Sequence, residues 1–211
     1  MATIFYTATT LDGYLADPDD SLNWLFRQAQ DPTPEGTESP FDYEQFIARV
    51  GALAMGATTY EWVRDHLAAT GESWPYSQPS WVFTHRELEP IEGADVRFTQ
   101  APVAEVHAEM TSVAGGSDLW LVGGGGLATE FAAAGLLDEL VLSIAPVTLG
   151  AGRPLFPGRF DLELIEHARN GAFVCALSGA RGTHRGPAGT FTSRTVIGWL
   201  ACNGSSPVSS V

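Results

Sequence analysis

The sequence predicts an α/β protein in which helices cover the faces of a central sheet. Strand-like and helix-like segments alternate along most of the 211-residue chain, a pattern typical of a mostly parallel sheet. Hydrophobic residues make up 45% of the sequence and charged residues 17%, which provides enough apolar surface for a folded core. The chain is too short for an eightfold β/α barrel, which needs about 250 residues.

The strands are predicted by short apolar runs rich in β-branched and aromatic residues and bounded by turn-forming residues. In chain order they cover residues 2–8, 52–55, 81–84, 96–99, 119–122, 140–145 and 172–177. The sequence Leu-Asp-Gly-Tyr at 11–14 predicts a turn after the first strand.

Helices are predicted where apolar residues recur every three or four positions between strands. They cover residues 41–50, 58–69, 103–114 and 127–136, with a loop or short helix at 21–30. Thr58 or Thr59 is expected to cap the second of these helices. The Pro- and Gly-rich stretch 31–40 is expected to be a surface loop.

The charge balance excludes several functions. The formal net charge is −14, so the protein as a whole repels phosphate backbones, and we expect no nucleic-acid partner. All 11 basic residues are arginines, which excludes lysine Schiff-base chemistry and a P-loop lysine. An anionic ligand therefore needs a local cationic or amide-lined site.

Targeting and metal signals are absent from the sequence pattern. The N-terminus has no basic start, and the longest apolar run, Leu140–Gly152, is shorter than the roughly 20 residues that cross a bilayer. We expect a cytoplasmic protein without a membrane partner. Cys175 and Cys202 are expected to be free thiols rather than a disulfide, and the spacing of the five histidines predicts no metal site.

The composition changes near the C-terminus. No acidic residue follows Glu166, and the last part of the chain is rich in glycine, serine and arginine. We therefore expect one domain over residues 1–175 and a mobile, atypical tail over residues 176–211.

Four consecutive glycines, Gly123 to Gly126, stand between a predicted strand and a predicted helix. Glycines let a ligand approach the backbone, and the N–H groups at a helix start suit a pyrophosphate. The alternative is a simple tight turn, but four glycines cost more backbone entropy than a turn requires. The segment also fits the dinucleotide-binding pattern G-x-G-x-x-G/A, although it lies too late in the chain for a Rossmann domain.

Two further strand ends carry residues that suit an anion. Gly56-Ala57-Thr58-Thr59 joins a strand to a helix, for which an ordinary helix cap is the alternative. Thr84-His85-Arg86 ends another strand, where a solvated surface arginine is the alternative. Three such strand ends in an acidic protein favour a phosphate-rich ligand.

Several motifs together resemble the bacterial dihydrofolate reductase-like family, which includes the reductase domain of the bifunctional riboflavin-biosynthesis deaminase-reductase (RibD C-terminal-domain-like reductases). They appear in the family's order within residues 2–175. They are TTLDGYLAD at 9–17 with LNWL at 22–25, MGATTYE at 55–61, LVGGGG at 121–126, and GLLDEL at 135–140 with APVTLGAGRPLF at 145–156.

The resemblance implies a three-layer α/β/α fold of the dihydrofolate reductase type, with a central mixed, mostly parallel β-sheet, a homodimer, and NADPH across the carboxyl ends of the strands. It also implies a cis peptide at Gly123-Gly124. Many relatives have arginine where this chain has Ala57. The implied cofactor-binding residues are Gly56, Ala57, Thr58, Thr59, Thr84, His85, Arg86, Val122, Gly123, Gly124, Gly125, Gly126 and Leu127.

The implied activity is reduction of a small heterocyclic (pterin- or pyrimidine-like) or carbonyl substrate by NADPH. The main alternative is a non-catalytic nucleotide-binding or dimer-forming protein that retains the fold, and a Rossmann dehydrogenase is a third. Strand order and NADPH oxidation separate the three.

Reduction also needs a proton source beside the nicotinamide. Asp42 precedes Phe46 by four residues on the predicted 41–50 helix, and Asp12 lies in the Leu-Asp-Gly turn. A helix-start acid and a turn-forming Asp-Gly are the respective alternatives.

The predicted substrate-binding residues are Trp24 and Tyr60, which would stack on a flat ring, and Glu139, which would line the pocket. Core packing of the two aromatic residues and a solvated acid before a strand are the alternatives.

Overall fold

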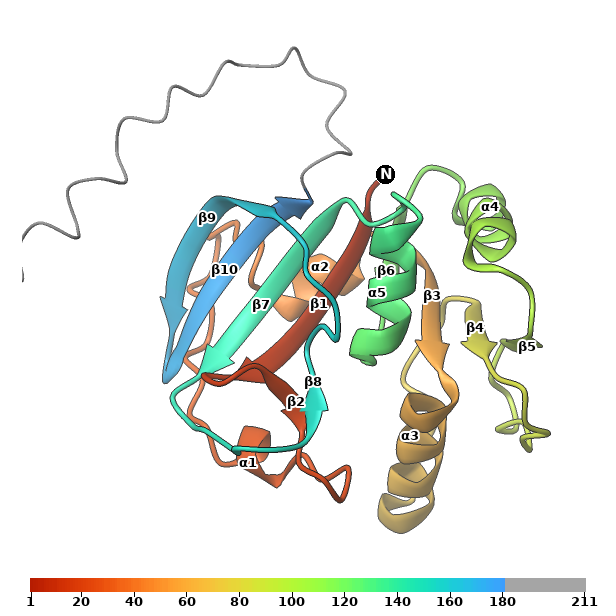
Figure 1. Cartoon of the computed structure of the whole chain (residues 1–211), viewed down its shortest axis with the longest axis horizontal. Coiled ribbons are helices and arrows are strands. Elements are labelled where there is room, and N and C mark those ends of the chain that lie inside the picture. Colours follow the sequence, from red (N-terminus) through yellow and green to blue (C-terminus); the bar gives the residue numbers. More distant parts are fainter. Residues whose placement is uncertain (181–211) are drawn as a thin grey trace, which may run out of the picture.

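The computed structural model describes residues 1–180, and an eight-stranded sheet forms its centre (Figure 1). The strands of this sheet are β1 Thr3–Thr10, β3 Val50–Gly56, β4 Ser80–Phe83, β5 Val96–Thr99, β6 Asp118–Leu121, β7 Glu139–Ala145, β9 Leu162–Asn170 and β10 Phe173–Ala180. Their order is β5-β4-β3-β6-β1-β7-β10-β9. Pairs from β5 to β7 are parallel, and β10 is antiparallel to both neighbours. The sheet is mixed and mostly parallel, as predicted.

Helices cover both faces of the sheet (Figure 1). They are α1 Asn23–Phe26, α2 Tyr43–Ile47, α3 Ala57–Thr70, α4 Val103–Ala114 and α5 Gly125–Ala133. Side chains that alternate along each strand feed two separate cores. Leu119 and Leu121 pack with α4 and α5, whereas Trp120 and Val122 pack with α1, α2 and α3 on the opposite face. The result is the predicted three-layer arrangement.

Some predicted boundaries are wrong for local reasons. The 41–50 helix is shorter, because Val50 already pairs in β3. Neither Thr58 nor Thr59 is the helix cap, since Gly56 occupies that position and α3 begins at Ala57. Three strands were not predicted: β9 and the short pair formed by β2 Tyr14–Ala16 and β8 Arg153–Pro154.

The strand order excludes the doubly wound dinucleotide fold. In that fold the first strand lies beside the second strand of its own half, whereas β1 lies between β6 and β7. The expected cis peptide is also wrong, because the described chain has no cis peptide bond. Gly123 and Gly124 make the turn instead through positive φ angles of 58° and 73°, which glycine adopts without steric cost.

The last strand, β10, continues to Ala180, five residues beyond the expected end of the domain. Cys175 in this strand is buried and is a free thiol. The rest of the predicted tail, residues 181–211 with Cys202, lies outside the described residues. The domain limit near residue 175 stays a prediction.

Two glycines allow β2, β8 and the start of α5 to touch through their backbones. A Cβ on Gly152, whose φ is 147°, would overlap the carbonyl oxygen of Ala16. A Cβ on Gly125 would overlap the carbonyl oxygens of Pro154 and Leu155. The β2-β8 pair therefore sits directly on the first turn of α5, where any larger residue would force the segments apart.

Gly125→Ala is expected to lower the free energy of unfolding by about 1–3 kcal/mol, because the added methyl group overlaps fixed backbone atoms. Gly126→Ala is the matched control, since no heavy atom lies within 4 Å of its Cβ position. We expect that variant to be neutral or up to about 1 kcal/mol more stable, from the better helix propensity of alanine. Urea denaturation of both variants measures the difference, and equal stabilities would contradict the close packing.

Candidate active site

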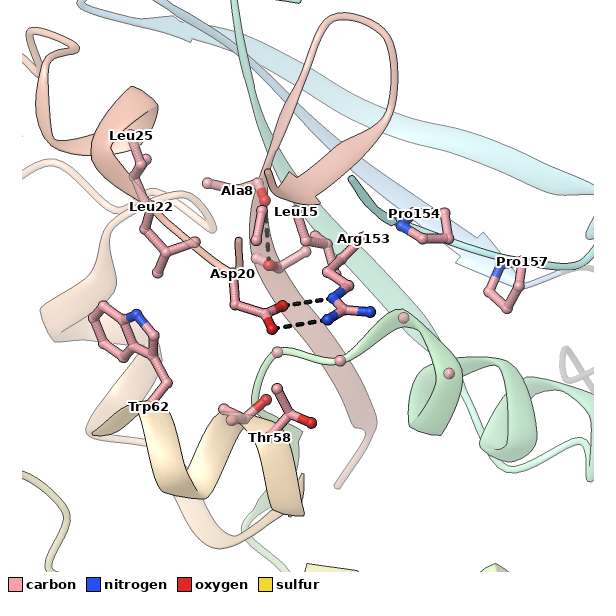
Figure 2. A pocket seen from close by; sticks show the side chains of 17 residues that line it. Ala8, Leu15, Asp20, Leu22, Leu25, Thr58, Trp62, Arg153, Pro154 and Pro157 are labelled. Atoms are coloured by element: carbon pink, nitrogen blue, oxygen red, sulfur yellow. Dashed lines mark hydrogen bonds and ion pairs between the residues drawn. The ribbon is translucent and has the colours of Figure 1, made fainter. Parts of the chain in front are cut away.

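A cleft of about 510 Å³ opens at the carboxyl ends of β1, β3 and β6 (Figure 2). Its volume falls within the usual range of ligand pockets, roughly 300–1,000 Å³. The edge formed by the carboxyl ends of parallel strands is the usual binding edge of α/β proteins. The lining residues are Thr7, Ala8, Leu15, Ala16, Asp20, Leu22, Leu25, Thr58, Thr59, Trp62, Gly123, Gly124, Gly125, Gly126, Arg153, Pro154 and Pro157.

Two helix N-termini meet in this cleft. Helix α3 starts after Gly56 and α5 after Gly124, and no side chain caps the first turn of either. Thr59 Oγ1 lies 3.1 Å from the place that a Cβ on Gly123 would take, so the two helix starts are neighbours. Uncapped N–H groups and two positive helix-dipole ends make this part of the cleft suited to an anion.

An apolar wall faces the glycine turn. Leu22, just before α1, and Leu25, within α1, form this wall together with Trp62 of α3. The Trp62 ring stacks on His66, with centroids 5.1 Å apart and planes inclined by 7°, and also on Phe26 at 6.5 Å and 20°. Ring contacts on two sides hold Trp62 in place, and this wall offers apolar surface to a flat, uncharged ligand.

The charges inside the cleft are paired. Among the described residues that line it, Arg153 is the only cation and Asp20 the only carboxylate. The guanidinium Nε donates to Asp20 Oδ1 at 2.5 Å and Nη2 donates to Oδ2 at 2.8 Å (Figure 2). These hydrogen bonds lower the pKa of Asp20 and raise the pKa of Arg153, so both groups are charged at neutral pH.

Of the residues predicted to bind a cofactor, the cleft brings together Thr58, Thr59 and the four glycines 123–126. Gly56 is the N-cap of α3 and Ala57 its first residue, and both directly precede Thr58 in the cleft lining. The side chains of Val122 and Leu127 are buried in the two cores.

The Thr84-His85-Arg86 corner does not line the cleft. Thr84 Oγ1 accepts a hydrogen bond from the Arg86 backbone N–H at 2.9 Å, which forms a local turn. The exposed Arg86 guanidinium pairs with Glu61 of α3, with Nη2 and Oε2 2.8 Å apart. His85 is exposed. Arg86 is therefore near the start of α3, but its charge is already neutralised.

Asp12 has a structural position rather than the expected place beside the ligand. Its carboxylate accepts hydrogen bonds from the Thr10 hydroxyl at 2.5 Å and from the Leu149 and Gly150 N–H groups at 3.0 and 2.7 Å. The Thr10 hydroxyl is the main reason that the pKa of Asp12 is lowered. An ionised acid that is absent from the cleft lining is unsuited to donate a proton.

Asp42 is the N-cap of α2 and does not line the cleft either. It accepts a hydrogen bond from the Gln45 N–H at 2.8 Å, and the Thr33 hydroxyl is the main cause of its lowered pKa. The helix-start alternative describes this residue better than the role of proton source.

The predicted substrate-binding residues also lie elsewhere. Tyr60 is fully buried and its hydroxyl donates to the Glu89 carbonyl oxygen at 2.7 Å. Trp24, on α1, is buried in the core, and Glu139 starts β7 outside the cleft lining. The residues that the sequence did not reveal are Trp62, Asp20 and Arg153, although Trp62 directly follows the motif at 55–61 and Arg153 lies within the motif at 145–156.

No cluster of three or more His, Cys, Asp or Glu residues suited to a metal is present in residues 1–180. Within the same residues, no helix is long and apolar enough to span a membrane.

Comparison with known proteins agrees with the fold. A family model described as the RibD C-terminal domain matches residues 2–175. The uncharacterized protein YwjB of Bacillus subtilis (strain 168) is 30% identical over 155 residues, which cover 73% of this chain and 82% of YwjB.

Solved structures give the same result. A crystal structure of a protein assigned to riboflavin biosynthesis in Shewanella sp. PV-4 has a TM-score of 0.69 and 27% identity, covering 86% of this chain and 99% of that chain. Dihydrofolate reductase of Enterococcus faecalis in complex with NADP(H) has a TM-score of 0.54 and 15% identity, covering 85% and 96% of the two chains. The chain therefore has a dihydrofolate reductase-like fold.

Asp12→Asn is expected to lower the melting temperature at pH 7, because an amide cannot accept all the hydrogen bonds that the carboxylate accepts. The pKa of Asp12 is lowered in the folded state, so its stabilisation is complete above the ordinary value of 3.8 and is lost as the pH falls through the lower folded value. Calorimetry between pH 7 and pH 3 measures both melting temperatures. A difference that persists unchanged at the lowest pH would contradict this role.

Proposed function

This chain belongs to the RibD C-terminal domain family, and from that premise we propose that it is an NADPH-dependent reductase of a small heterocyclic or carbonyl substrate. The observation that carries the proposal is the meeting of two uncapped helix starts and a four-glycine turn in one cleft. The family's fold is that of reductases, and a relative of the same fold binds NADP(H).

The chain's own residues supply binding and orientation. The N–H groups at the start of α3 and around Gly123 to Gly126 hold the pyrophosphate through oriented dipoles. Ala8 and Leu15 line the part of the cleft beside β1. An uncharged ring that packs there removes apolar surface from water, which favours binding. When bound there, NADPH supplies a hydride to an electron-poor carbon of the substrate.

The substrate lies against Trp62, Leu22 and Leu25 in this proposal. These residues form the apolar wall opposite the glycine turn, and a ring packed against the edge of Trp62 can face the cofactor across the cleft. A flat pterin- or pyrimidine-like ring fits this wall better than a charged, flexible chain. Trp62 thus provides the aromatic contact first expected of Trp24 or Tyr60.

The proton that accompanies the hydride comes from water in the open cleft. Among the described lining residues, the only carboxylate is Asp20, and its pKa is lowered by Arg153. Such a group does not carry a proton at neutral pH. Solvent delivery accounts for the proton without Asp12 or Asp42.

The homodimer expected from the family stays part of the proposal. Leu164 on β9 and Val174 on β10 are 60% and 56% exposed. In Figure 1 this end of the sheet has no helix in front of it. Exposed apolar side chains on an uncovered sheet face are typical of an interface.

NADPH is expected to bind saturably to the purified full chain, with quenching or enhancement of nicotinamide fluorescence and a matching calorimetric isotherm. Absence of saturable binding would reject the proposal. With binding established, oxidation of NADPH is assayed against pterins, deaminated pyrimidines, quinones and aldehydes. Binding without oxidation of NADPH by any of them would favour the non-catalytic alternative.

Asp12→Asn and Asp42→Asn should retain activity, since loss of a true general acid costs about 10²–10⁴-fold.

Arg86→Ala is expected to weaken NADPH binding by about tenfold and to leave NADH binding nearly unchanged, because only NADPH carries the 2′-phosphate that a nearby guanidinium can bind. Glu61→Gln is the opposing control. It removes the carboxylate that pairs with Arg86 and should tighten NADPH alone. Isothermal titration with both nucleotides measures these changes, and equal effects on NADH would show that Arg86 does not contact the extra phosphate.

A further inference from the structure

An arginine–carboxylate pair occupies the middle of the cleft, between Thr58 and Leu15 (Figure 2). The pair joins Arg153 of β8 to Asp20, a residue of the loop after β2. The rest of the described lining is uncharged. Any anion drawn to the glycine turn therefore meets one cation, and that cation is already held by a carboxylate.

The position of Arg153 is fixed by its backbone. It pairs with Ala16 of β2, and Gly152 before it lies against the Ala16 carbonyl oxygen. The following residues, Pro154 and Leu155, lie against Gly125 in the first turn of α5. The guanidinium thus extends from a segment that is packed on the uncapped start of a helix, beside the glycines that suit a phosphate.

The backbone of Asp20 is fixed in a turn by its hydrogen bond to the Asp17 carbonyl oxygen, whereas its carboxylate hydrogen-bonds to Arg153 alone among residues 1–180. Its φ of 60° makes it the only non-glycine residue with a positive φ among the described residues, a conformation that Asp and Asn tolerate better than most residues. The pair is bidentate, but the side chains of Arg153 and Asp20 are 58% and 35% exposed, so water can solvate each group when the pair opens. Within residues 1–180, the Nη1 atom of Arg153 has no hydrogen-bond partner. The guanidinium therefore has one donor nitrogen available to a phosphate, and an incoming phosphate can replace the carboxylate at the other two positions.

Resting on the proposed function, we propose that Arg153 binds a phosphate oxygen of the dinucleotide and that Asp20 competes with this phosphate for the guanidinium. A carboxylate a few ångströms from a bound phosphate repels it, because both carry negative charge. A guanidinium that leaves Asp20 gains a charge-assisted hydrogen bond to the phosphate in exchange. The exchange favours ligands that also bind the helix starts, so Asp20 discriminates against small anions that make one contact.

Asp20→Asn and Arg153→Gln test the exchange by calorimetric titration with NADPH, NADH and inorganic pyrophosphate. Asparagine keeps the tolerance for positive φ but removes the charge. We expect Asp20→Asn to tighten all three ligands by about three- to tenfold and Arg153→Gln to weaken them by at least about tenfold. Glu61→Gln is the matched control, because it frees a different arginine and should change NADPH binding only.

The double variant adds a second readout. If Asp20 acts by occupying Arg153, Asp20→Asn should tighten binding less once Arg153 is glutamine, so the two effects will not add. Additive effects, or weaker binding by Asp20→Asn, would overturn the proposal and leave the pair as a structural tie.

The failure of this proposal differs from the failure of the proposed function. Wild-type protein that binds NADPH, together with an unchanged affinity in Asp20→Asn, overturns the exchange alone. Wild-type protein that binds pyrophosphate but neither dinucleotide rejects the reductase while the pyrophosphate titrations still decide the exchange. Wild-type protein that binds none of the three ligands overturns both.

Discussion

The close approach of three backbone segments is the constraint on which the site depends. Gly152 lets β8 touch the end of β2, and Gly125 lets the same segment touch the first turn of α5. Because no side chain separates these segments, the loop that carries Asp20 and the strand that carries Arg153 stand over a helix start. The cleft is thus a product of packing, and its chemistry follows from which backbone groups the packing leaves uncapped.

Most of the positive charge of the described residues is paired with carboxylates. The chain has a net charge of −14, and six arginines within residues 1–180 form ion pairs with carboxylates. They include Arg86, which pairs with Glu61 of α3, and Arg153, which lines the cleft. An anionic ligand must therefore bind to oriented amides, to a guanidinium released from its partner, or to both. Binding through fixed backbone dipoles suits a strongly acidic protein, because backbone amides, unlike arginines, are not neutralised by neighbouring carboxylates.

The sequence predicted the parts of this arrangement that are local. Strand-helix alternation indicated the sheet, and the chain turns after β3 and β6 could be expected to meet, because parallel strands end at one edge. Asp20 and Arg153 are 133 positions apart in the sequence, and nothing in either segment indicates a partner so distant. Nothing in the sequence distinguishes Trp62 from Trp24 and Tyr60 as the aromatic residue that contacts a ligand. The structure does, because Trp24 and Tyr60 are buried and Trp62 lines the cleft. Asp12 and Asp42 had the right residue type, but local hydrogen bonds claim both carboxylates.

In the function proposed here, the backbone N–H groups at the two helix starts hold the ligand's phosphates. Amide chemical shifts in a ¹⁵N-labelled sample titrated with NADPH test it most directly, because each N–H group reports on its own environment. We expect saturable shifts that are largest at Ala57 to Thr59 and Gly123 to Leu127, with one shared dissociation constant. Shifts confined to other parts of the molecule, while these amides stay unchanged at saturation, would contradict it.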